Sequence, residues 1–364
     1  MSLEQEIQRA QKTIVRDNLD MSFGELINIY QEKEIYINPE FQRLYRWDET
    51  QKTRFIESLL LNIPIPPIFV FTREDGKWEL IDGLQRLSTV LQFVGKLRKN
   101  DESEELWEPY FSCTGTNMLP SLDGKHWPRE GAEDHDNALT SSQQIQIKRA
   151  KIRVEILSKM SDIQAKFELF QRLNTGGSTL VPQEIRNCMI ASINPVFYSQ
   201  IKELSSNADF ISTLSLSESK KEQSADLELI IRFLAYRNHP YEGRLDINEY
   251  LDKATVQLCQ DQNFNFRREK EIFEKTFSLL NQAASSDAFK RRRGNFSIAA
   301  YEFATLGLSK YLENKEADSD WVKTKLATMQ ALPDFETYTA AGITGPRRLS
   351  NLIFTQAETF FADE

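Results

Sequence analysis

The sequence predicts an α+β protein, with a small mixed sheet and helices in front and only helices behind. Short apolar or β-branched runs at residues 68–71, 78–81 and 152–157 have the length and composition of strands. Behind residue 193, apolar positions recur at helical spacing and no run reads as a strand. These observations predict an α+β front and an all-helical rear.

The length of the chain predicts two domains. With 364 residues it is too long for most single hydrophobic cores. We expect one domain at 1–192 and a helical domain at 193–364. Residues 100–145, first acidic and then rich in Gly, Pro, Ser and Asp, are expected to form an insertion in the first domain.

Capping and turn signals place the first elements in order. Residues 3–17 are polar with scattered apolar positions and are expected to form an exposed helix. Ser22, with Glu25 three residues later, forms a capping box at the start of a second helix. Residues 36–43 are predicted to be extended, because Pro39 biases the residue before it away from the helical region.

The next elements lead into a strand-to-helix turn. Asp48 begins a helix that stops before Pro64, and Asp75-Gly76 indicates a hairpin between two strands. An apolar helix is expected over 84–97. The other predicted helices are 162–173, 182–189, 227–236, 271–280, 298–312 and 349–361.

Composition limits the class of protein. The formal net charge is -9, which argues against tight non-specific binding of DNA through its phosphates. A local basic groove is still compatible with this charge. Its candidates are Lys290, Arg291, Arg292 and Arg293, with Arg347 and Arg348, although a basic run is usually a solvated face.

Cysteine usage and the N-terminus predict a cytoplasmic protein. The three cysteines are far apart and form no metal-binding spacing with histidine. Residues 1–12 lack the apolar core of a signal peptide, and no apolar run is long enough to span a membrane.

The strongest local motif is Asp82-Gly83-Leu84-Gln85-Arg86, where a strand turns into a helix. A helix start has unpaired N–H groups and partial positive charge, so it stabilises a phosphate. Gly83 permits a sharp turn, and Arg86 in the first turn can grip phosphate oxygens. Asp82 can bind Mg²⁺, cap the helix or orient Arg86. The plain alternative is a capped helix with a surface arginine.

Two further segments carry binding candidates. Gln42, Arg43 and Arg46 stand among aromatic residues, a pattern suited to a phosphate with a stacked base. The alternative is a packed aromatic edge with solvated arginines.

The other segment contains paired glycines, whose N–H groups can face an anion, or else a simple junction between two helices. Glu184 follows it and is a second candidate ligand for Mg²⁺, beside Asp82. The residues of this loop are Asn174, Thr175, Gly176 and Gly177.

Several enzyme classes are excluded. The chain has no GxxxxGK[ST] segment, so it is not a P-loop NTPase. It also has no GxGxxG motif after a strand. None of its three histidines has metal-ligand spacing with another His or Cys. No pair of acidic residues can be assigned acid and base roles from the sequence alone.

Taken together, these segments resemble the GmrS-like N-terminal domain of GmrSD-type, modification-dependent restriction systems. The resemblance is clear over roughly the first half of the chain. It is weaker over the helical rear half, where residues 226–229 and 232–233 still match the family's pattern. It is carried by residues 39–43 with Trp47, by 58–67, by 81–86, and by 170–180 with 184–186.

The resemblance implies a ParB/sulfiredoxin-like fold that binds, and in several members hydrolyses, a nucleoside triphosphate (NTP). We expect Mg²⁺ to accompany the NTP, with Asp82 or Glu184 as its ligand. It implies a role in sensing or controlling attack on foreign or modified DNA. The family's Asp-Gly-x-Gln-Arg residues are here Asp82, Gly83, Gln85 and Arg86, with Asp82, Gln85 and Arg86 as the catalytic candidates. Gln42 and Arg43 match its other expected nucleotide residues.

Two departures from the family pattern affect the expected function. Leu84 stands where the family usually has Gln, which removes one hydrogen-bonding group and puts nucleotide identity or turnover in doubt. Many relatives carry a C-terminal His-Asn-His nuclease domain, for which this chain has too few histidines. We therefore expect a sensor portion that works with a separate nuclease subunit.

Three readings of function remain open at this point. The first is an NTP-binding, NTP-hydrolysing sensor or regulatory component of a DNA restriction or phage-defence system. The second is a non-catalytic module that binds DNA or a partner protein. The third, ranked last, is a front domain that cuts DNA itself.

Overall fold

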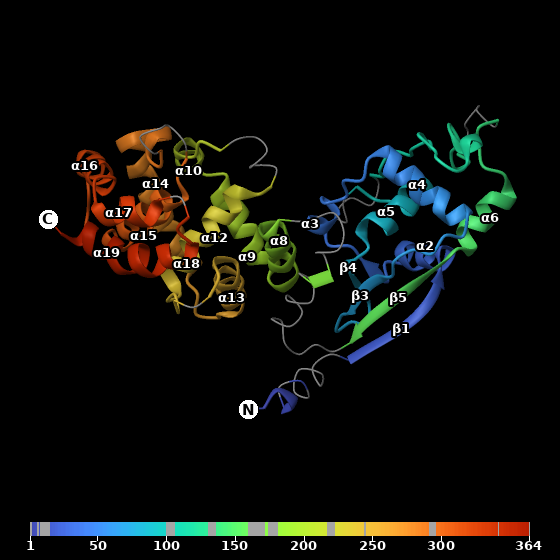
Figure 1. Cartoon of the computed structure of the whole chain (residues 1–364), viewed down its shortest axis with the longest axis horizontal. Coiled ribbons are helices and arrows are strands. Elements are labelled where there is room, and N and C mark those ends of the chain that lie inside the picture. The colour runs from blue at the N-terminus through green and yellow to red at the C-terminus, as the bar shows by residue number, and fades with distance from the viewer. Residues whose placement is uncertain are drawn as a thin grey trace. The chain divides into compact units, whose positions relative to one another are not determined.

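The computed structural model describes residues 2–5, 7, 15–99, 106–129, 136–158, 172–173, 181–216, 223–243, 245–290, 296–340 and 342–363. The chain divides into two compact units, Met1–Ser178 and Thr179–Glu364 (Figure 1). A mixed sheet with helices forms the first unit, and the described part of the second is helical. The predicted α+β class is confirmed.

The sheet of the first unit has five strands in the order β1-β5-β3-β4-β2. The pairs β1/β5 and β3/β4 are antiparallel, and β5/β3 and β4/β2 are parallel. Gly76, with a φ of +81°, lies in the predicted hairpin turn between β3 and β4. The strands are β1 (Val15–Ser22), β2 (Ile35–Tyr36), β3 (Ile68–Thr72), β4 (Trp78–Asp82) and β5 (Lys151–Ser158).

Strand β1 corrects one prediction. Residues 15–17 belong to this strand, so the helix predicted over 3–17 is wrong there. The strand pairs along its whole length with β5, from which it is far in sequence. Its polar sequence gives no strand signal by itself, and the exposed charge of Asp20 suits an edge strand.

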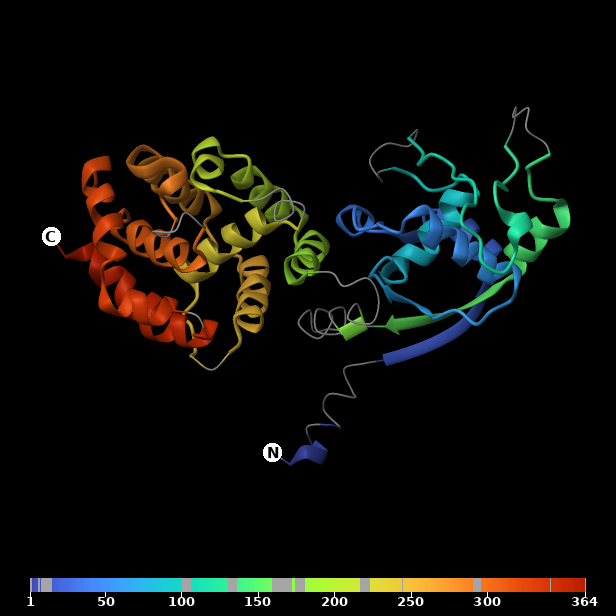
Figure 2. The same ribbon diagram turned by 45° about the horizontal axis from the view of Figure 1, so that its top comes forward.

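Side-chain caps begin most helices of this unit. Ser22 with Glu25, Asp48 with Gln51, and Thr140 with Gln143 form capping boxes. The predicted starts at Ser22 and Asp48 are confirmed. Figure 2 shows the helices between residues 23 and 149 on one side of the long strands β1 and β5. They are α2 (Phe23–Gln31), α3 (Pro39–Gln42), α4 (Glu49–Leu60), α5 (Leu84–Phe93), the short η1 (Pro120–Leu122) and α6 (Ser141–Arg149).

Two predicted boundaries in this unit are wrong. The segment predicted to be extended over 36–43 contains the helix α3. Asn38 itself is not helical, but its Oδ1 accepts the N–H of Glu40 at 2.9 Å and so caps this helix. Helix α5 ends at Phe93, four residues before the predicted end. Gly95 follows with a φ of +70°, a conformation that ends helices.

The second unit is a bundle around helix α15, which is buried on nearly all sides. The boundary predicted at residue 192 lies at the end of α8, the first helix of this unit. The longer elements are α8 (Pro182–Ile193), α9 (Pro195–Ser205), α10 (Ala208–Thr213), α12 (Ala225–Asn238), α13 (Ile247–Gln260), α14 (Phe266–Ala284), α15 (Ile298–Tyr311), α16 (Ser319–Met329), α17 (Pro333–Thr339), and α19 (Phe354–Ala362). The short ones are η2 (Ser285–Asp287), α18 (Gly345–Arg348) and η3 (Leu349–Ile353).

A buried ionic cluster lies inside this bundle. The fully buried Glu302 accepts hydrogen bonds from Arg232 Nη1 at 2.7 Å, Tyr236 Oη at 2.8 Å and Arg348 Nε at 2.8 Å. Glu228 also accepts from Arg232 Nε at 2.9 Å. Burial raises the pKa of the Tyr236 hydroxyl well above its usual value, so this group remains a donor. The cluster joins α12, α15 and α18.

Over the described ranges, no helix has both the length and the apolar character needed to cross a membrane.

Candidate functional site

Helix α5 begins without a side-chain cap. Strand β4 ends at Asp82, Gly83 follows with a φ of +98°, and the helix starts at Leu84. The first bond inside the helix runs from Leu87 N–H to the Gly83 carbonyl at 3.0 Å. In the described part of the chain, no side chain binds the N–H groups before it. These N–H groups therefore have no side-chain partner there, which is a condition for binding an anion.

Two independent constraints require glycine at position 83. Its φ lies in the left-handed region, which side chains rarely adopt. A Cβ atom here would also come within 2.3 Å of Ile68 Cγ2 on β3. The start of α5 therefore lies so close to Ile68 of the sheet that the space between them holds no side chain at position 83.

The side chain of Arg86 is held in the first turn of α5. Its Nη2 donates to Asp82 Oδ2 at 2.8 Å and to the Pro67 carbonyl at 3.0 Å. Its Nε is buried, and neither Nε nor Nη1 has a partner among the residues that the structure describes. Asp82 thus orients Arg86, one of the roles predicted for it. The guanidinium is therefore positioned by Asp82 and the Pro67 carbonyl, and it has donors that no described residue uses.

Gln85 uses its amide to hold the loop that carries the other predicted motif. Its Nε2 donates to the Leu44 carbonyl at 2.6 Å, and its Oε1 accepts the N–H groups of Arg46 and Trp47, each at 3.1 Å. The structure therefore brings these two sequence segments together. The catalytic role of Gln85 stays a prediction, and its contacts give it a positioning task.

The loop 42–47 carries exposed arginines on an anchored backbone. Gln42 Nε2 donates to the Arg98 carbonyl, and Tyr45 Oη donates to Gln92 Oε1 on α5 at 2.8 Å. Arg43 is 62% exposed and its Nη1 lies 2.9 Å from Glu40 Oε1. Arg46 is also exposed. Binding of a nucleotide by Gln42, Arg43 and Arg46 stays a prediction.

Replacing Gln85 with alanine is expected to loosen this loop without unfolding the unit. Three hydrogen bonds to the backbone would be lost, each contributing about 0.5–1.5 kcal/mol. Amide hydrogen exchange should therefore accelerate about tenfold or more at Arg46 and Trp47. The control is Gln31→Ala, an exposed glutamine at the end of α2 that should leave exchange there unchanged. Equal protection in both variants would contradict the positioning role.

Leu84, the departure from the expected motif, is buried, with 4% of its surface exposed. It belongs to the buried face of α5 and offers no polar group to the turn. Leu84 would therefore contribute no side-chain hydrogen bond to an anion at this turn.

The two residues predicted to bind Mg²⁺ belong to different units. Asp82 lies in the first unit, where its Oδ2 accepts from Arg86. Glu184 lies in the second and caps α8, its Oε2 accepting the Val181 N–H at 3.0 Å. In the described ranges, His, Cys, Asp and Glu form no group of three that could hold a metal ion. Binding of Mg²⁺ by either residue stays a prediction.

Arg186 has a structural task that the sequence did not reveal. It is fully buried, and its Nε donates to Asp252 Oδ1 at 2.6 Å. Its Nη2 donates to Asn248 Oδ1 at 2.8 Å and its Nη1 to Gln183 Oε1 at 3.0 Å. Since Asn248 and Asp252 lie on α13, this arginine joins α8 to the helical bundle.

Some predicted site residues lie outside the described residues. These are Asn174, Thr175, Gly176 and Gly177 of the glycine loop, and Arg291, Arg292 and Arg293 of the basic run. Lys290 is described, and its Nζ lies 2.8 Å from Asp287 Oδ1. Its contact with nucleic acid stays a prediction.

The motifs coincide with a known family. Residues 24–191 match the model of the family described as GmrSD restriction endonuclease, N-terminal domain. This segment therefore belongs to the GmrSD N-terminal domain family, which confirms the resemblance. No curated protein and no solved structure matches the chain, so the ParB/sulfiredoxin-like fold stays a prediction.

Proposed function

We propose that the first unit binds a nucleoside triphosphate at the start of α5. In this proposal the protein is a sensor or regulatory component of a DNA restriction or phage-defence system. The observation that carries the proposal is the uncapped helix start after Gly83, with Arg86 held in its first turn. The family's description as a restriction endonuclease supports the cellular role.

In the proposed complex, the phosphate oxygens accept hydrogen bonds from the N–H groups at the start of α5 and from Arg86. Backbone N–H groups and a pre-positioned guanidinium stabilise such charge without having to reorganise. The exposed Arg43 supplies a further cation from the anchored loop. Mg²⁺, when bound, would neutralise phosphate charge, with the second oxygen of Asp82 as its candidate ligand.

Hydrolysis of the triphosphate requires more than this binding geometry. A water molecule must be positioned for in-line attack. The amide of Gln85 is engaged with Leu44, Arg46 and Trp47 and can position water only if the loop is released. We therefore propose binding as the primary activity and assign turnover, where it occurs, to a state in which this loop has moved.

The Arg86→Ala variant tests the nucleotide site. We expect at least one of ATP, GTP, CTP and UTP to raise the melting temperature of the wild type, since a ligand of the native state stabilises it. Arg86→Ala removes charged hydrogen bonds worth about 1.5–3 kcal/mol, so the affinity for that nucleotide should fall tenfold to a hundredfold. The control is Arg54→Ala, an exposed arginine on α4.

Each nucleotide is tested with and without Mg²⁺, and phosphate release is followed in parallel. An unchanged melting temperature with all four NTPs would contradict the proposal. DNA binding that ignores nucleotides and weakens steeply with salt would favour a DNA-binding module instead.

A further inference from the structure

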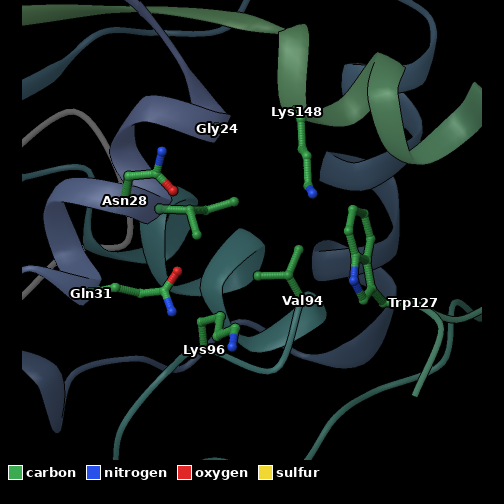
Figure 3. Close-up of a pocket in the computed structure, with 8 residues that line it drawn as sticks. Gly24, Asn28, Gln31, Val94, Lys96, Trp127 and Lys148 are labelled. Atoms are coloured by element: carbon green, nitrogen blue, oxygen red, sulfur yellow. The ribbon is translucent and has the colours of Figure 1, made fainter. Parts of the chain in front are cut away.

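A cavity lies at the other end of α5, away from the start of this helix (Figure 3). Its volume is about 270 Å³. An α-helix rises about 1.5 Å per residue, so the ten residues of α5 place this cavity roughly 15 Å from the turn at Gly83. The residues that line it come from α2, α6, the end of α5 and one loop: Gly24, Ile27, Asn28, Gln31, Val94, Lys96, Trp127 and Lys148.

The lining is cationic although the chain as a whole is acidic. Lys96 and Lys148 line the cavity with no carboxylate, whereas the net charge of the protein is -9. Within the described residues, neither amine has an ion pair. The side-chain amides of Asn28 and Gln31 likewise have no protein hydrogen bond there. The Lys148 Nζ lies 5.6 Å from the centre of the Trp127 ring, a cation-π contact within the cavity. The hydrogen-bonding groups of all four polar side chains have no described hydrogen-bond partner.

An aromatic wall and an apolar floor complete the cavity. Figure 3 shows the Trp127 ring on one side, Lys148 pointing inward, and the amides of Asn28 and Gln31 opposite. The Phe93 ring packs edge-on against the indole, with 6.1 Å between centroids. Ile27 and Val94 are buried beneath. The indole is thus fixed before any ligand arrives.

The backbone around Trp127 is also held in place. The His126 N–H donates to the Asn137 carbonyl at 3.0 Å, and the Leu139 N–H donates to the His126 carbonyl at 2.9 Å. On the opposite side, the Phe23 N–H donates to the Ala150 carbonyl at 3.0 Å, which ties the start of α2 to the end of α6. Backbone bonds therefore hold the Trp127 loop to residues 137–139 and the start of α2 to the end of α6.

We infer that this cavity is a second ligand site, one that takes a nucleoside monophosphate. The indole suits a stacked base once the Lys148 amine, which lies over the ring, turns to the phosphate. The two amides offer donors and acceptors to the edge of the base, and the two amines suit the phosphate. Since the lining has two amines and no carboxylate that could bind a metal ion, it suits a single phosphate better than a triphosphate with its metal. This site is distinct from the proposed triphosphate site and does not depend on it.

The lysines also complement the partial negative charge of helix ends, since Lys148 is in the last turn of α6 and Lys96 follows α5. This contribution is separable from ligand binding. Arg149 occupies the same last turn of α6, is exposed and does not line the cavity. The variant Arg149→Gln therefore removes the same charge from the same helix end.

The test is calorimetric titration of the full chain with AMP, GMP, CMP and UMP. We expect at least one to bind, and expect about tenfold or weaker binding in Lys148→Gln and in Lys96→Gln, since each removes a charged contact. Trp127→Leu should also lose affinity. Arg149→Gln and Arg86→Ala should bind like the wild type.

Three results would overturn the inference. They are no binding of any monophosphate, equal affinity in the wild type and the lysine variants, or inorganic phosphate binding as tightly as the nucleotides. Melting temperatures without ligand identify a variant that is destabilised. In that case Lys148→Arg, which keeps the charge, must restore binding, and failure to do so would also overturn it. Loss of monophosphate binding in Arg86→Ala alone would assign it to the other site.

Discussion

Replacing Glu302 with glutamine is expected to lower the free energy of unfolding of the helical unit by about 3–5 kcal/mol, the cost of breaking a buried ionic cluster on one side. Glu302 is fully buried and binds Arg232, Tyr236 and Arg348. Glutamine keeps the shape but not the charge. Arg232 then keeps its ion pair with Glu228. Arg348, whose side chain is only 17% exposed, loses its ion pair with the carboxylate of Glu302.

Amide hydrogen exchange of α12 and α15 measures this effect within one unit. The control is Glu271→Gln, the same change in the exposed pair with Arg267, whose nitrogen and oxygen lie 3.2 Å apart. Exposed pairs contribute about 0.2–1 kcal/mol. If both variants exchange alike, the buried cluster is not a main source of stability in this bundle.

Replacing Gly83 with alanine should destabilise the first unit and disable the proposed nucleotide site together. The left-handed φ costs about 1–2 kcal/mol for a residue with a Cβ. The contact with Ile68 at 2.3 Å adds about 1–3 kcal/mol of overpacking. Because relief of the clash must move the start of α5, NTP affinity should fall with stability.

Gly76→Ala separates the two costs. Gly76 has a φ of +81°, and a Cβ there meets nothing within 4 Å, so only the backbone cost applies. A double-mutant cycle gives a second check, because Ile68→Ala removes the clashing methyl group. Gly83→Ala should therefore cost less in the Ile68→Ala background than in the wild type. An equal cost in both backgrounds would show that the contact is not the cause.

Local signals predicted much of the fold. The start of α2 followed from the capping box at Ser22, the start of α4 from Asp48 before a run with helical spacing, and the β3/β4 hairpin from Asp75-Gly76. Strand β1 could not be predicted, since a polar strand at a sheet edge is specified by its pairing with β5. Tertiary contacts, not local pattern, form such elements.

The candidate site was predictable in position but not in its internal contacts. The strand-to-helix turn at Gly83 was predicted from residue order. The bond from Gln85 to the loop at Leu44 could not be predicted, because long-range hydrogen bonds leave no periodic signal in a sequence. The cavity beside Trp127 was also missed, since Lys96 and Lys148 are far apart in sequence and resemble ordinary surface lysines.

The contacts of Arg186 bear on how such proteins can be recombined. The segment that matches the family ends at residue 191, yet the Arg186 partners Asn248 and Asp252 lie 62 and 66 residues further along the chain. A chimera that joins this segment to an unrelated rear half would leave this buried guanidinium without its Asn and Asp acceptors, with Gln183 still beside it. Exchange of rear halves between relatives therefore requires that the new rear half supply an Asn and an Asp one helical turn apart at the positions of Asn248 and Asp252.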